Sequence, residues 1–112
     1  MVITPGCGPG EVGSIPTCRP FNKKMRIFCF GDSITYGKWD AKHCGWVQRL
    51  RRFLDKNWEI YGDNLVYNLG VSGDTTKNLL TRFEFEIEQR LKEEKEEVLI
   101  IFDIGINDSL FF

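Results

Sequence analysis

The stretch Met25-Arg-Ile-Phe-Cys-Phe-Gly-Asp-Ser33 decides the fold of this chain. Its apolar run, Met25–Phe30, is closed by Gly31 and predicts a short buried strand. Two more runs of this kind follow, at Leu65–Leu69 and Val98–Ile104. Strands that are apolar along nearly their whole length are typical of a parallel sheet that is covered on both faces.

The segments between these strands carry the periodicity of helices. From Trp46 to Leu54, apolar residues recur at helical spacing along one face and charged residues lie elsewhere, which predicts an amphipathic helix. A second helix is predicted to begin at a capping residue, Thr75 or Thr76, and to continue to Leu91. The alternation of strand and helix predicts an α/β fold with right-handed crossovers, in which ligands bind beyond the carboxyl ends of the strands.

The first 24 residues differ in composition from the rest. All four prolines lie among them, together with four of the 11 glycines. Proline withholds a backbone donor and glycine resists ordering, so residues 1–24 are expected to form an irregular tail. The domain is expected to span residues 25–112, and the charge run at residues 92–97 indicates a solvated surface within it.

Charge and composition exclude several classes of function. The chain has 112 residues and a formal net charge of −1, from 15 basic and 16 acidic side chains, so nothing favours nucleic acid or an anionic membrane as a partner. The longest apolar run is too short to cross a bilayer and the start lacks the features of a secretory signal, so a cytoplasmic location is expected. With one histidine and no paired cysteine spacing, neither a metal site nor a cofactor is expected. The cysteines are expected to be free thiols; they are Cys7, Cys18, Cys29 and Cys44.

Glycine and small polar residues follow each predicted strand, in the segments Gly31–Gly37, Asn68–Thr76 and Gly105–Asp108. These segments are expected to meet at one edge of the sheet. Ser33, at the turn into a helix, should expose its hydroxyl there beside its own N–H. Gly73 offers a second N–H and Asn107 offers a side-chain amide. Three such donors form a pocket for the oxyanion that develops in acyl transfer.

These segments resemble the sequence blocks of the SGNH (GDSL-type) serine hydrolases. Phe30-Gly-Asp-Ser33 resembles block I, Gly70-Val-Ser-Gly-Asp-Thr75 resembles block II, and Gly105-Ile-Asn-Asp108 resembles block III. The resemblance implies a flavodoxin-like three-layer α/β/α sandwich with a parallel sheet, of which this chain contains the first three strands. It also implies hydrolysis of small-molecule carboxylic esters or thioesters without a metal.

The same resemblance implies the role of each site residue. Ser33 is the expected nucleophile, and its N–H, the N–H of Gly73 and the side chain of Asn107 form the expected oxyanion hole. Gly31 and Asp32 are expected to lie against the substrate, and His43 either to face the substrate or to be a solvated loop residue. The carboxylates of Asp32 and Asp108 are expected to hydrogen-bond within their loops. A purely structural role is the alternative for three of these residues: Ser33 as a helix cap, Gly73 as a turn residue, and Asn107 as a residue that only holds its loop.

The fourth block of the family is an Asp-x-x-His segment late in the chain, which supplies the catalytic base. The present chain ends five residues after Asn107, and its one histidine lies in Asp40-Ala-Lys-His43, before the first long helix. This local match is interpreted as part of a loop and not as the base. A truncated or split hydrolase is therefore expected; the alternative is a non-catalytic half-domain that acts only with a complementary chain.

The strand order that the resemblance implies places the first strand in the centre of the sheet and the third at an edge, where it should pair with other chains. It carries neither the lysines nor the prolines that block pairing at edge strands. We therefore expect the 112-residue chain by itself to self-associate, to aggregate, or to require a complementary C-terminal fragment. Size-exclusion chromatography combined with thermal melting tests this expectation, and a sharp monomer peak with a cooperative melt would contradict it.

Overall fold

The fold is that of a computed structural model, which describes residues 24–92 and 96–111. Side chains are described up to Ser109. The expected irregular tail up to residue 23, with Cys7 and Cys18, lies outside the described residues, as does part of the predicted charge run.

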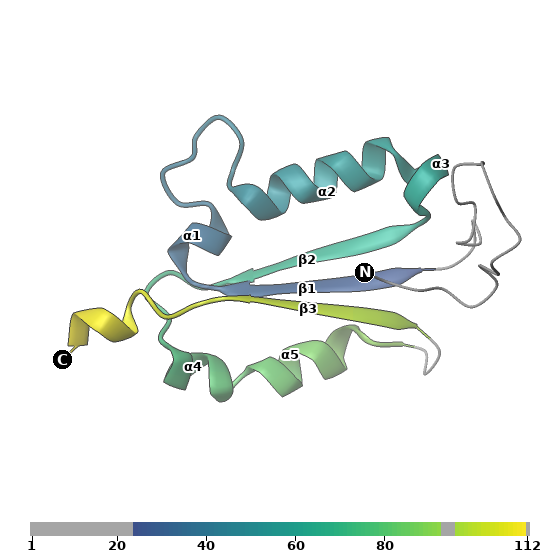
Figure 1. Cartoon of the computed structure of the whole chain (residues 1–112). Helices are drawn as coiled ribbons and strands as arrows, with labels where there is room; N and C mark the ends of the chain where they lie inside the picture. The colour runs from purple at the N-terminus through teal and green to yellow at the C-terminus, as the bar shows by residue number, and fades with distance from the viewer. Residues whose placement is uncertain (1–23, 93–95, 112) are drawn as a thin grey trace, which may run out of the picture.

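A three-stranded parallel sheet forms the centre of the molecule. Its strands are β1 (Met25–Gly31), β2 (Asn64–Gly70) and β3 (Glu97–Asp103), in the order β2-β1-β3. β1 pairs with both neighbours along its whole length, so the three last residues lie side by side. The predicted parallel α/β sheet, with the first strand in the centre, is confirmed, and all three carboxyl ends lie at one edge (Figure 1).

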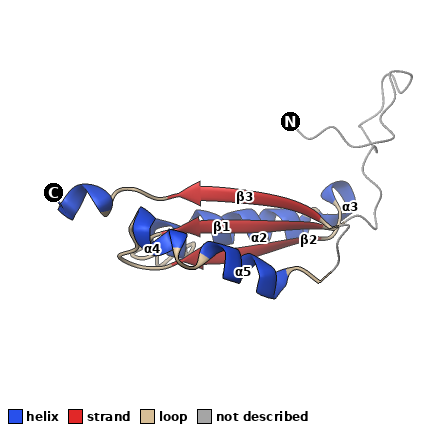
Figure 2. Cartoon of the chain, turned by 90° about the horizontal axis from the view of Figure 1, so that it is seen from below, coloured by secondary structure: helices blue, strands red, loops and turns tan. Residues whose placement is uncertain are grey.

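Helices cover both faces of this sheet (Figures 1 and 2). Between β1 and β2 lie α1 (Ser33–Tyr36), α2 (Trp46–Lys56) and α3 (Trp58–Tyr61); between β2 and β3 lie α4 (Thr76–Leu80) and α5 (Phe83–Arg90); η1 (Asp108–Phe111) follows β3. α2 packs on one face, and α4 and α5 pack on the opposite face, which is the predicted three-layer arrangement. No helix within residues 24–92 and 96–111 has the length and apolar character needed to cross a bilayer.

Successive side chains of β1 point to opposite faces and so build two separate cores. Phe28 and Phe30 pack toward α4 and α5, whereas Ile27 and Cys29 pack toward α2. Phe28, Cys29 and Phe30 are fully buried, and full burial of a phenylalanine side chain contributes roughly 1.5–3 kcal/mol. β1 is therefore held in place by both layers of helices.

The prediction of one continuous second helix is wrong, because the helix is broken in two. α4 ends at Leu80 and α5 begins at Phe83. Between them, Thr81 donates its hydroxyl and its N–H to the carbonyl of Asn78, at 2.6 and 3.2 Å. A threonine that bonds to a carbonyl of the preceding turn competes with the regular helical pattern. Arg82 follows in a non-helical conformation (φ −125°, ψ −19°) and caps α5.

β3 lies at an open edge of the sheet. Its exposed apolar side chains are Val98, Leu99, Ile100 and Phe102. One ring face of Phe102 stacks on Phe30, with 5.7 Å between the ring centroids, yet half of its surface remains exposed. The expectation that this strand is covered on both faces is therefore not met within the described part of the chain.

The two described cysteines should differ in reactivity. Burial raises the pKa of the Cys29 thiol to about 11, whereas Cys44 is exposed. At pH 8 only about one Cys29 thiol in a thousand is then ionised, so iodoacetamide should alkylate Cys44 and spare Cys29 in the folded protein. Peptide mapping by mass spectrometry, before and after unfolding in urea, measures this. Equal alkylation of both cysteines before unfolding would contradict the burial of β1.

Candidate active site

Ser33 is the first residue of α1, directly beyond the carboxyl end of β1. The residue before it caps this helix: Oδ1 of Asp32 accepts a hydrogen bond from the N–H of Ile34 at 2.9 Å. Since Asp32 has the capping role, the alternative that Ser33 is only a helix cap loses its support. Ser33 is half-buried, and neither its hydroxyl nor its N–H has a hydrogen-bond partner among the described residues. Within this part of the chain, both groups are open to a ligand.

Gly31 and Asp32, which were expected to lie against the substrate, have structural roles. The side chain of Asp32 is buried in the cap and Asp32 as a whole is 2% exposed. A contact of Asp32 with substrate stays a prediction. A Cβ at Gly31 would overlap the hydroxyl of Thr35. Glycine at this position therefore lets α1 fold back closely on the end of β1.

A side chain of β2 fixes the end of α1. Asn68 donates through Nδ2 to the carbonyl of Thr35 and accepts through Oδ1 from the N–H of Gly70, both at 3.0 Å. The N–H of Val71 donates to the carbonyl of Gly31, also at 3.0 Å. The loop that carries Ser33 and the loop after β2 are thus joined by hydrogen bonds.

The loop after β2 carries Gly73 in a turn. Its φ of 84° lies in the left-handed region that favours glycine, and the N–H of Asp74 closes the turn on the carbonyl of Val71 at 3.1 Å. A Cβ on Gly73 would have no described atom within 4 Å, so the turn explains the glycine. The N–H of Gly73 has no partner among the described residues, and the open space beside it leaves room for a ligand oxygen.

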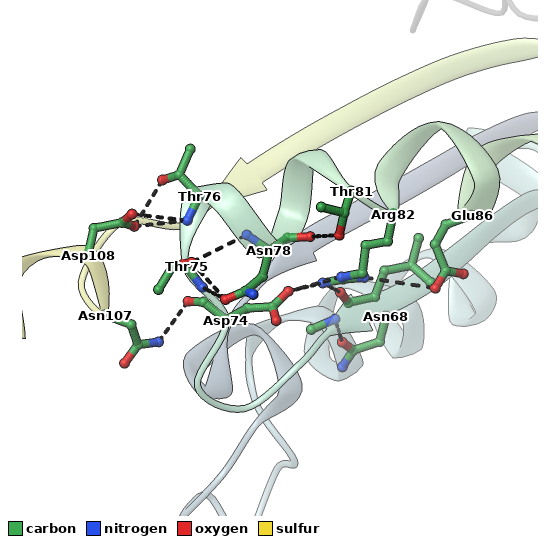
Figure 3. A network of polar contacts seen from close by, with 12 residues as sticks. Asn68, Asp74, Thr75, Thr76, Asn78, Thr81, Arg82, Glu86, Asn107 and Asp108 are labelled. Atoms are coloured by element: carbon green, nitrogen blue, oxygen red, sulfur yellow. Dashed lines mark hydrogen bonds and ion pairs between the residues drawn. The ribbon is translucent and has the colours of Figure 1, made fainter. Parts of the chain in front are cut away.

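Two side chains bond the loop after β3 to the loop after β2 (Figure 3). Asn107 donates through Nδ2 to the carbonyl of Asp74 at 2.9 Å. Oδ2 of Asp108 accepts from the N–H and the hydroxyl of Thr76, at 3.0 and 2.9 Å, which is the loop role expected for Asp108. An asparagine amide has two N–H bonds. Asn107 therefore holds its loop and still has a second N–H for a ligand.

An ion pair that the sequence patterns did not indicate lies on the other side of the loop after β2. Oδ2 of Asp74 accepts from Nε of Arg82 at 2.9 Å and lies 2.8 Å from Nη2. Both side chains are largely buried, and removal of one partner of such a pair costs roughly 3–5 kcal/mol. The sequence held one sign of this pair: Arg82 is a charged residue on the otherwise apolar face of the predicted helix, between Leu79 and Phe83.

The Asp40–His43 segment forms a turn. Asp40 accepts hydrogen bonds from the backbone N–H groups of His43 and Gly45, both at 3.0 Å. These bonds hold the pKa of the Asp40 carboxyl below its usual range. Among the described residues, no hydrogen bond joins the imidazole of His43 to Asp40 or to Ser33. Asp40 closes this loop, and a contact between His43 and substrate stays a prediction.

A cavity of about 310 Å³ lies where this loop meets α1 and the start of α2. Ile34, the residue after Ser33, belongs to its lining, and two cationic side chains, Lys38 and Arg49, also face it. Trp46 is a further lining residue, and its Nε1 is buried with no hydrogen-bond partner among the described residues. A concave region that combines apolar surface with a few polar groups is typical of small-molecule sites.

Comparison with known proteins identifies relatives of this chain. Residues 29–112 match the GDSL-like lipase/acylhydrolase family. Two solved structures are similar: AlinE4, a SGNH-hydrolase family esterase, and an aspartate-to-alanine variant of the esterase AlinE4. Each is 30% identical with a TM-score of 0.58, and each match covers 80% of this chain and 44% of the solved chain. No curated protein sequence matches.

The family match and the two structural matches both concern the part of the chain that holds the sheet and the loops at its carboxyl edge. The chain spans less than half the length of the solved esterases, but the family match includes the end of β1, all of β2 and β3, and the loops that follow the three strands. We conclude that this chain belongs to the GDSL-like lipase/acylhydrolase family.

Proposed function

We propose that this chain contributes the nucleophile and the oxyanion hole of a serine esterase that acts on carboxylic esters or thioesters. One observation carries this proposal. Ser33 lies at the end of β1 with a hydroxyl that has no hydrogen-bond partner within the described part of the chain, while Asp32 caps the helix in its place. The family match and the likeness to two esterases support the same reaction class.

In this mechanism the oxygen of Ser33 attacks the ester carbonyl carbon, and negative charge develops on the carbonyl oxygen. Three donors would stabilise that charge: the N–H of Ser33, the N–H of Gly73 and the second N–H of the Asn107 amide. The first two have no partner among the described residues, and Asn107 is held by its bond to Asp74. Donors that are oriented before the reaction supply a large part of catalysis in acyl transfer.

The reaction also needs a general base, because a serine hydroxyl is a poor nucleophile at neutral pH. His43 is the one histidine of the sequence, and the carboxylate of Asp40 is engaged by backbone N–H groups instead of the imidazole. We infer that an Asp-x-x-His segment outside these 112 residues supplies the base. The cavity beside Ile34 would then receive one of the two groups of the ester.

A second proposal is a half-domain that is inactive by itself and acts only with a complementary chain. The open edge of β3 favours it, since several apolar side chains of that strand are exposed. One measurement, hydrolysis with and without a separate C-terminal fragment, distinguishes the two proposals. Hydrolysis that appears only when a separate C-terminal fragment is added supports the half-domain, whereas hydrolysis by a single continuous chain supports the first proposal.

Replacement of Ser33 by alanine should abolish hydrolysis of p-nitrophenyl acetate in a protein extended to include the Asp-x-x-His block. The variant removes the nucleophile and leaves the cap at Asp32 in place, so its melting temperature should not change. Ser109→Ala, which removes another hydroxyl near the same edge, is the matched control and should retain activity. Full activity of Ser33→Ala would rule out the assignment.

Replacement of Asn107 by alanine or aspartate should lower kcat in the same protein by on the order of a hundredfold, with KM changed less than about threefold. Both variants lose the donor, and the aspartate variant keeps the size of the side chain. Steady-state kinetics measure the two constants. A change in KM alone would show that Asn107 only helps to hold the substrate.

A further inference from the structure

The side chain of Arg82 lies beside the end of β2, and Figure 3 shows its contacts with Asp74 and with Glu86 of α5. Its Nε donates to the carboxylate of Asp74 at 2.9 Å, and its Nη2 donates to the carbonyl of Leu69 at 2.8 Å. Its guanidinium also lies over the ring of Phe30 in β1, 5.7 Å from the ring centroid. One buried cation therefore contacts two strands and a loop.

These partners lie at the two ends of the loop that carries Gly73. Leu69 precedes this loop, and Asp74 lies at its far end, just before the cap of α4. Asp74 also accepts, through its backbone carbonyl, the hydrogen bond from Asn107. The position of both predicted oxyanion donors thus depends on Asp74, and Asp74 is held by Arg82.

The loop has few other restraints. Its own backbone bonds are those of Val71 to Gly31 and of Asp74 to Val71, and Gly73 is exposed in a left-handed turn. Arg82 reaches the loop from the break between α4 and α5, where its backbone is not helical. A guanidinium can donate to a carboxylate and a carbonyl at once in a fixed plane, which a lysine ammonium cannot reproduce.

We propose that Arg82 is a positioning residue of the oxyanion hole: it orients Gly73 and Asn107 toward the oxygen that becomes negative. This inference rests on the proposed function. An arginine with this role acts on the transition state and not on substrate binding, so its replacement should change kcat and leave KM nearly constant.

The test compares Arg82→Lys with Arg90→Lys in the same protein extended to include the Asp-x-x-His block. Arg90 also forms an ion pair on α5, with Glu86 at 2.6 Å, but its contacts within the described residues are with Glu86 and Tyr67 and do not include the loop. We expect Arg82→Lys to lower kcat for p-nitrophenyl acetate by about tenfold or more, with KM within about twofold. Arg90→Lys should keep both constants. Thermal melts show whether each variant is folded. Titration with a fluorophosphonate counts the reactive serines, and each rate is divided by that count.

Two further variants separate positioning from general loss of structure. Asp74→Asn keeps the size of the side chain but weakens the bond to Arg82, and it should reproduce the loss in kcat. In the background of Asn107→Ala, the kcat loss from Arg82→Lys should shrink at least about threefold, because part of the oriented donor set is already gone. A purely structural effect would persist undiminished in that background.

The outcomes distinguish this inference from the proposed function. If Ser33→Ala retains hydrolysis and fluorophosphonate labelling, the proposed function fails. If Ser33 is required but Arg82→Lys and Asp74→Asn keep kcat, or change only KM, the positioning role of Arg82 is overturned. Full persistence of the Arg82→Lys loss in the Asn107→Ala background would also overturn it.

Discussion

The register of β1 with its two neighbours is the constraint on which the rest of the molecule depends. Both pairings run along the whole of β1, so the three strands end at the same level. A shift of β1 by one residue would turn Phe28 and Phe30 toward α2 and exchange the two cores. Phe28 and Phe30 belong to the core on the side of α4 and α5, whereas Ile27 and Cys29 pack with Val47 of α2 on the opposite side. The observed register keeps each of these side chains in its own core and aligns the three loops.

Polar side chains then bond these loops to each other across the sheet edge. Asn68 of β2 bonds the end of α1, and Asn107 after β3 bonds the loop after β2. Asp108 bonds the start of α4. Few of these bonds lie within a single loop, so each loop is positioned by the next one. Donors held in this way need little reorganisation when charge develops on a substrate, which is the property that an oxyanion hole requires.

In the proposed mechanism, the described residues serve attack on the ester and stabilisation of the developing charge. The hydroxyl of Ser33, which has no hydrogen-bond partner among the described residues, would attack the ester, and the donors beside it would stabilise the charge. Proton transfer would also need a base. The local Asp40–His43 match does not provide that pair in this structure, because both carboxylate oxygens of Asp40 accept backbone N–H groups of the loop. A sequence match of four residues thus corresponds to a turn in this structure.

The sequence by itself determined the three strands, the helical segments between them, and the loops that carry Ser33, Gly73 and Asn107. Apolar runs and helical periodicity are local signals, and the three blocks are short and specific. Tertiary structure decided the rest. Asn107 and Asp74 are 33 residues apart. Arg82 lies at the break between α4 and α5 and bonds to Asp74. The partner of Asn107 becomes available only after the sheet has brought two distant loops together. The partner of Arg82 lies in the same segment, but helical periodicity does not indicate that the helix breaks there.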